Sequence, residues 1–124
     1  MKKAYFLIAV FAAGFLLYNA FFSAPEQKKS FVTNVIDGDT IVISGGERVR
    51  LLGIDAPEKG EFFYKEAKAR MEQLVENQEV TLEKESENKD KYGRLLRYIF
   101  VNSTNVNLFL VQEGYAICYL YEDE

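Results

Sequence analysis

The chain opens with one long apolar segment. Residues 4–22 (AYFLIAVFAAGFLLYNAFF) carry no charged side chain, and as a helix they would extend about 28 Å, close to the thickness of a bilayer's hydrocarbon core. We interpret residues 1–24 as a signal anchor, which contacts the membrane through residues 4–22, or as a signal peptide that is cleaved. Lys2 and Lys3 favour a cytoplasmic N-terminus, so the rest of the chain is predicted to lie outside the cytoplasm, membrane-anchored or secreted.

A polar segment, residues 25–30, is predicted to be a linker to a single domain over residues 31–124. In that domain the pattern changes to short apolar and β-branched runs bounded by turn residues. These runs predict five strands, over residues 31–36, 40–43, 48–54, 79–83 and 94–101. Short glycine-containing turns join the first three, which predicts an antiparallel meander.

Two segments between or after these strands have an apolar period near 3.6. Residues 61–77 predict an amphipathic helix, and residues 105–113 predict a second one, capped by Ser103 or Thr104. Five strands with one helix after the third and one after the fifth indicate an α+β fold dominated by β structure. The best match is a five-stranded Greek-key barrel of the OB type, whose exposed face commonly takes oligonucleotides or oligosaccharides.

Composition restricts the chemistry that this domain can perform. The chain has no histidine and one cysteine, Cys118, which excludes histidine-based catalytic triads, histidine-ligated zinc and an intrachain disulfide. Its 19 acidic side chains outnumber its 15 basic ones. Binding of a polyanion therefore needs a local cluster of positive charge or a bound cation.

Carboxylates and arginines concentrate beside the predicted tight turns. Each one alone is explained by ordinary turn chemistry or by an arginine that snorkels at a strand end, so the pattern has a purely structural reading. Together they offer oxygen ligands for a hard cation and guanidinium donors for phosphate. In chain order these residues are Asp37, Asp39, Arg50, Asp55, Glu58 and Arg94.

Three ordered motifs, VIDGDT, RLLGIDAPE and DKYGRLLRYIF, resemble the staphylococcal nuclease (thermonuclease) family. The resemblance covers about residues 31–121, and NLFLVQEGYA also resembles the stretch that follows the last barrel strand in that family. It implies that Asp39 and Asp55 hold Ca²⁺, that the main-chain oxygen of Ala56 is a further ligand, and that Asp37 supports the metal site.

The same resemblance assigns roles around the metal. Arg50 and Arg94 match the two arginines that grip the phosphate, and Glu58 matches the glutamate assigned to water activation. We expect substitution of either arginine to remove activity and to leave the fold largely intact. Four more residues match positions beside the bound nucleotide: Lys91, Tyr92, Tyr119 and Tyr121.

The sequence thus predicts a calcium-dependent endonuclease, a monomer that hydrolyses phosphodiester bonds of single- or double-stranded DNA and RNA. The alternative is a noncatalytic module of the same family that binds nucleic acid or another partner. Two departures from the family bear on this. Residues 59–63 are shorter than the family's mobile pocket loop, and the family continues past the position of Glu124 into a third helix, so we expect a fragment or a domain that lacks its C-terminal helix.

Overall fold

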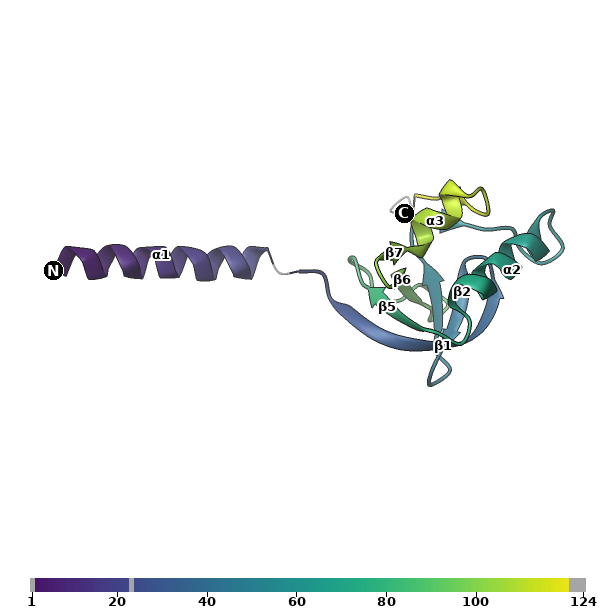
Figure 1. The fold of residues 1–124 in the computed structure, drawn as a ribbon, viewed down its shortest axis with the longest axis horizontal. Helices are drawn as coiled ribbons and strands as arrows, with labels where there is room; N and C mark the ends of the chain where they lie inside the picture. Colours follow the sequence, from purple (N-terminus) through teal and green to yellow (C-terminus); the bar gives the residue numbers. More distant parts are fainter. Residues whose placement is uncertain (1, 23, 121–124) are drawn as a thin grey trace.

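The computed structural model describes residues 2–22 and 24–120. The first element, α1 (Lys2–Phe21), is an apolar helix whose described residues are all exposed, and Figure 1 shows it extending away from the remainder of the chain. By length and composition it suffices to cross a membrane. The helix is therefore compatible with a signal sequence or an anchor.

The rest of the described chain is built around a closed barrel. Five strands follow one another in the order β3-β2-β1-β5-β6; neighbours are antiparallel, and a parallel pairing of β3 with β6 closes the ring. This arrangement confirms the predicted five-stranded OB-type barrel. The strands are β1 (Gln27–Asp37), β2 (Thr40–Ile43), β3 (Arg48–Leu51), β4 (Ile54–Asp55), β5 (Glu79–Glu83), β6 (Leu95–Val101), β7 (Thr104–Asn105) and β8 (Ile117–Cys118).

The long strand β1 forms part of two neighbouring walls of the barrel. Its first half pairs with β5, from Gln27 opposite Glu83 onward, and its second half pairs with β2 through two register shifts that bend it. The strand begins at Gln27, so most of the segment predicted as a linker, residues 25–30, is strand. Its side chains are exposed and polar, which hid the strand in the hydropathy pattern, because backbone pairing with β5 requires no apolar side chains.

Two helices cover the barrel. α2 (Tyr64–Val75) buries Ala67, Met71 and Val75 against β1. α3 (Val106–Gln112) packs on β6. Its cap is Asn105, whose side chain accepts the backbone N–H of Leu108, rather than the predicted Ser103 or Thr104. Ser103 lies in the turn before β7, and Thr104 lies in β7, directly before this cap.

The predicted strand over residues 48–54 is interrupted, and this interruption shapes the candidate site. Leu52 and Gly53 form a turn between β3 and β4, and Gly53 has φ of 74°, in the left-handed region that favours glycine. β4 leaves the barrel and pairs with β8 instead.

The barrel interior is filled by fully buried aliphatic side chains, chiefly Val32, Val35, Ile41, Val49, Leu51, Met71, Val80, Ile99, Val106 and Leu110.

Candidate functional site

The turn between β1 and β2 carries a buried carboxylate. Asp39 is 5 % exposed. Its Oδ1 accepts a hydrogen bond from Thr40 Oγ1 (2.9 Å), and its Oδ2 accepts one from the backbone N–H of Ala56 (2.8 Å). A buried carboxylate is unfavourable unless it is hydrogen-bonded, so these donors hold Asp39 in place and join the turn to the end of β4.

Gly38 allows this close approach of the turn. A Cβ atom at Gly38 would lie 2.8 Å from the Cβ of Ala56 and 3.0 Å from the Cβ of Ala67. Real Cβ atoms do not come this close to a neighbour that cannot move, and both neighbours are held by backbone. The turn, β4 and α2 therefore meet at a point where only glycine fits.

Arg50 is the second buried charge, with 7 % of its surface exposed. Its Nη1 donates to the main-chain oxygens of Leu51 (2.7 Å) and Ile54 (2.8 Å), on either side of the break between β3 and β4. Its Nη2 lies 3.3 Å from Asp39 Oδ2 and 3.5 Å from Asp55 Oδ1. Arg50 thus stabilises the turn between β3 and β4 and brings the two carboxylates to one point.

Asp55 and Asp37 are the partly exposed carboxylates of this cluster. The Asp55 side chain is 47 % exposed, so one side of the cluster is open to solvent. Asp37 accepts the backbone N–H of Asp39 (3.0 Å). Partial burial, together with the neighbouring Asp39 carboxylate, raises the pKa of Asp37 from 3.8 to about 6.

The oxygen donors of this cluster fit a hard divalent cation. Carboxylate and main-chain oxygens are the ligands that Ca²⁺ and Mg²⁺ prefer, and a carboxylate oxygen accepts more than one contact. Within residues 2–22 and 24–120, no three His, Cys, Asp or Glu side chains are grouped closely enough to enclose a metal. A cation shared by Asp39 and Asp55 would therefore take further ligands from main-chain oxygen, water or substrate.

Glu58 lies outside this network of contacts. It follows β4 in an exposed turn, where its backbone N–H donates to Glu61 Oε1 (2.9 Å) and its main-chain oxygen accepts the N–H of Glu61 (2.9 Å). In the described part of the chain, the Glu58 carboxylate has no hydrogen-bond or ion-pair partner. The turn thus presents a carboxylate to solvent three residues after Asp55.

The second arginine, Arg94, belongs to the turn between β5 and β6. Asp90 organises this turn: its Oδ1 accepts the backbone N–H groups of Tyr92 (2.9 Å) and Arg94 (3.0 Å), and its Oδ2 accepts Arg94 Nε (2.7 Å). The Arg94 guanidinium and the Lys91 ammonium each lie 5.3 Å from the Tyr92 ring centre. Lys91 and Tyr92 are exposed, and Arg94 is partly exposed behind the Tyr92 ring.

The parallel pairing of β3 with β6 relates the two arginines. Arg50 is in register with Leu96, and Arg94 precedes Leu96 by two residues. Arg94 directly precedes β6, so this pairing brings the turn that carries Arg94 next to the strand that carries Arg50. Among the described residues no hydrogen bond or ion pair connects the two groups, and the Nη1 and Nη2 atoms of Arg94 have no hydrogen-bond partner.

The chain beyond α3 returns to the Asp55 strand. Asp55 is in register with Ile117, and the backbone N–H of Tyr119 donates to the main-chain oxygen of Gly53 (2.8 Å). This pairing places Tyr119, 44 % exposed, beside the break that Arg50 holds together. Tyr121, the other predicted nucleotide-binding tyrosine, lies outside the described residues.

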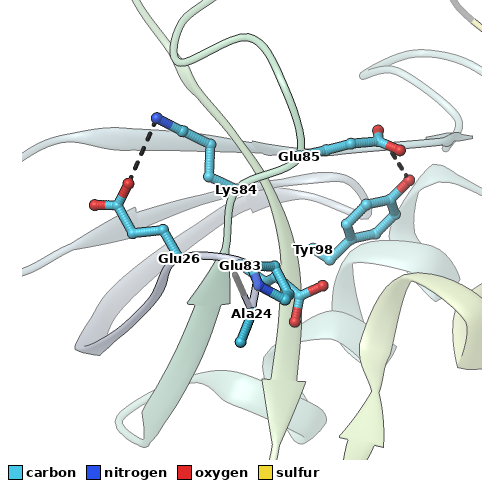
Figure 2. A pocket seen from close by; sticks show the side chains of 7 residues that line it. Ala24, Glu26, Glu83, Lys84, Glu85 and Tyr98 are labelled. Carbon is cyan, nitrogen blue, oxygen red and sulfur yellow. Dashed lines mark hydrogen bonds and ion pairs between the residues drawn. The ribbon is translucent and has the colours of Figure 1, made fainter. Parts of the chain in front are cut away.

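A cleft shown in Figure 2 lies away from all of these residues. It is lined by the segment that leads into β1, by the end of β5 with the two residues that follow it, and by Tyr98 of β6. Figure 2 shows Lys84 directed toward Glu26 and Tyr98 toward Glu85. Glu26, Glu83 and Glu85 make the cleft acidic, so it repels phosphate. It contains none of the residues singled out from the sequence.

Several residues that the sequence did not single out position the ones that it did. Thr40 and Asp90 hold Asp39 and Arg94, as described above. The buried Asn107 of α3 donates to the main-chain oxygens of Leu52 (2.8 Å) and Arg97 (3.3 Å), which ties the break between β3 and β4 to β6. Thr40, Asp90 and Asn107 stand inside the DGDT, DKYGR and NLFLVQEGYA stretches, so motif membership was the available signal for all three.

Comparison with known proteins places this architecture in a family. The family model described as "Staphylococcal nuclease homologue" matches residues 48–124. The thermonuclease of Staphylococcus intermedius is 40 % identical over 99 residues, covering 73 % of this chain and 59 % of that protein. The micrococcal nuclease of Shigella flexneri is 40 % identical over 103 residues, covering 73 % and 58 %.

A third relative, endonuclease YncB of Bacillus subtilis, is 39 % identical over 113 residues, covering 81 % of this chain and 54 % of that protein. The chain thus spans less than two thirds of the length of these relatives. The family that matches agrees with the five-stranded barrel. The chain belongs to the staphylococcal nuclease family.

Proposed function

We propose that this chain is a metal-dependent nuclease that hydrolyses phosphodiester bonds of DNA or RNA, with Ca²⁺ as its cofactor. The observation that carries the proposal is the convergence of Asp39 and Asp55 on one nitrogen of Arg50, beside the solvent-exposed edge of the cluster. Relatives named thermonuclease, micrococcal nuclease and endonuclease support it. A barrel that only binds nucleic acid has no need of two converging carboxylates, which repel phosphate in the absence of a cation.

Asp39 and Asp55 would hold the cation, with the main-chain oxygen of Ala56 as a further ligand and Asp37 in support. A cation held there would polarise a phosphate oxygen and make water a better nucleophile. The carboxylates offset the positive charge and fix the place at which phosphate is held. Arg50 keeps both carboxylates at that place through its Nη2 group.

The remaining groups act on the phosphodiester and the attacking water. Arg94 offers the free fork of its Nη1 and Nη2 atoms, which matches two phosphate oxygens and stabilises the charge that develops on them. Glu58 accepts or orients the proton of the attacking water, a task for which its exposed carboxylate is available. Lys91, Tyr92 and Tyr119 bind the nucleotide on either side.

The test is cleavage of labelled single-stranded DNA and RNA by the full chain in detergent, with Ca²⁺ and with chelator. We expect cleavage that requires the cation and falls as salt is added, because phosphate binding releases counterions. The matched control is Asp55→Asn, which keeps the size of the side chain and removes its charge. Binding without cation-dependent cleavage by a folded sample would favour the noncatalytic alternative.

We also propose that α1 exports the domain or anchors it outside the cytoplasm. The exposed apolar helix supports this, because none of its described side chains is buried against the barrel domain. Fractionation of cells that express the full chain gives the test. We expect to find the domain on the outer side of the membrane. Recovery of the full chain in the cytoplasmic fraction, with α1 not inserted in a membrane, would contradict the proposal.

A further inference from the structure

Phe62, in the turn between Glu58 and α2, is exposed without a structural reason. It is 94 % exposed, a larger fraction than for any other large apolar side chain among the described residues. A Phe two positions before a helix often packs on the residue at the fourth helical position, here Ala67, and so fixes the entry of the chain. At this exposure Phe62 makes no such contact and has no part in the core.

Phe62 is instead the outer end of a row of aromatic rings. Its ring is stacked with that of Phe63, with 6.1 Å between centroids, and the Phe63 ring is stacked with that of Tyr115, with 5.6 Å between centroids. Tyr115 packs against the hydrophobic core. The row therefore runs from the core to solvent, with its inner end fixed and the outer ring uncovered.

The backbone at Phe63 is strained to produce this arrangement. Phe63 has φ of 70°, a left-handed conformation that bulky residues rarely adopt, and it is the residue that precedes the first turn of α2. Such conformations persist where the surroundings enforce them, and they cluster at ligand-binding sites. Here the strain lies at the middle ring of the row and sets the direction of Phe62.

The row lies close in the chain to Glu58, one of the candidate catalytic residues. Phe62 follows Glu58 by four positions. The turn between them is closed by two hydrogen bonds between Glu58 and Glu61. Lys59 and Lys65 flank the aromatic residues on both sides, are exposed, and have no ion-pair partner in the described part of the chain. An uncovered ring with unpaired ammonium groups on either side complements a nucleobase and its phosphates.

We propose that Phe62 stacks on an unpaired base of the nucleic-acid substrate, next to the scissile phosphate. The inference rests on the proposed function and deepens it, because it adds a contact with a base to the contacts with phosphate that the candidate site offers. In a duplex, both faces of each base are already covered by neighbouring bases, so this contact is made only with unpaired segments. Stacking on a ring tolerates any base, which predicts little sequence preference at this position.

The test measures binding of a labelled single-stranded oligonucleotide to the full chain in detergent, with chelator present, by fluorescence anisotropy. Phe62→Ala should weaken binding roughly 5- to 150-fold, the range for loss of one stacked base, whereas Phe62→Trp should retain or strengthen it. Phe31→Ala is the matched control, because Phe31 is also an exposed Phe (44 %) but lies on β1. Binding of a duplex should change little in any of these variants.

A second arm locates the base. A series of oligonucleotides is used, each with a single abasic site at a different position. At one position the missing base should weaken binding to the unsubstituted chain. At that position the missing base should not weaken binding to Phe62→Ala any further, because the contact is already lost. Equal binding by Phe62→Ala and the unsubstituted chain, or an equal loss in Phe31→Ala, would overturn the stacking proposal. Cleavage with Ca²⁺ is scored separately: binding through Phe62 without any cleavage would contradict the nuclease proposal and leave the stacking contact standing.

Discussion

The two arginines of the candidate site are in opposite environments. Arg50 is buried, and its Nη1 and Nη2 atoms are engaged by two main-chain oxygens and two carboxylates. Arg94 has a side chain 27 % exposed and engages one carboxylate through Nε, and among the described residues its Nη atoms have no hydrogen-bond partner. Arg50 thus uses its donors within the protein, whereas the Nη atoms of Arg94 are available to a ligand.

This difference separates two ways of contributing to a site. A guanidinium whose donors are used internally fixes the positions of other groups, and its removal leaves buried acceptors and charge uncompensated. A guanidinium with free donors contributes little to folding and acts when phosphate arrives. The expectation that either arginine can be replaced without harm to the fold is therefore revised for Arg50 and kept for Arg94.

The largest expected effect is on stability, for Arg50→Ala. Breaking one side of a buried charge cluster typically removes about 3–5 kcal/mol, a large part of a domain's usual 5–15 kcal/mol. Urea unfolding followed by circular dichroism measures it. Arg48→Ala, at an exposed arginine on the same strand, is the control and should change the free energy of unfolding by less than about 0.5 kcal/mol. An Arg50 variant as stable as this control would end the contrast between the two arginines.

Arg94→Ala should show the reverse separation. We expect nuclease activity to fall about 10²- to 10³-fold, because a preorganised donor to phosphate is lost. The free energy of unfolding should fall by less than about 1 kcal/mol, since the side chain makes one partly exposed ion pair. Arg94→Lys keeps the charge without the fork and should recover only part of the rate. An unchanged rate in Arg94→Ala would exclude phosphate binding by this residue.

Gly38→Ala tests the packing beneath the buried cluster. The added methyl group overlaps Ala56 and Ala67, and overpacking of this kind typically lowers the free energy of unfolding by about 1–3 kcal/mol. Ala56→Gly removes the nearest contact, so the double variant should lose less than the sum of the two single losses. Strictly additive losses, measured by urea unfolding, would show that the turn does not press on Ala56.

The two regions should also differ in how their stability responds to pH. The folded state raises the pKa of Asp37 to about 6, so the folded chain binds this proton more tightly than the unfolded chain, and stability falls as pH rises from about 4 to about 6. Asp37→Asn should flatten this part of the profile, measured by urea unfolding at steps of pH. A profile unchanged by the substitution would contradict the raised pKa.

Asp90 provides the opposite case in the exposed turn. Partial burial opposes ionisation of Asp90, but hydrogen bonds from the backbone and side chain of Arg94 outweigh it and lower the pKa. Its contribution to stability is therefore present above the ordinary pKa of an aspartate and is lost as pH falls through the lowered value. Asp90→Asn should reduce the dependence of the free energy of unfolding on pH only at the acid end of the range. This distinguishes Asp90→Asn from Asp37→Asn.

Local pattern was sufficient for most of the barrel. The strands beginning at Thr40, Glu79 and near Arg94 follow from short apolar runs between turn residues, and α2 follows from its period of 3.6. The start of β1 at Gln27 was missed because its pairing with β5 depends on backbone alone. The break at Leu52 and Gly53 was missed because the run looks continuous and the turn is stabilised by a side-chain contact of Arg50 and by the distant Asn107.

For the candidate site, the sequence was enough to identify which residue types stand beside which turns, because carboxylates, arginines and glycines at tight turns leave a local signature that also carries the family resemblance. Only the tertiary structure decided how those residues are used. Burial, the commitment of Arg50's donors, the freedom of Arg94 and the exposure of Phe62 depend on segments that lie far apart in the chain and meet only after the barrel closes. Such contacts are properties of the folded packing and not of neighbouring residues, so no local pattern records them.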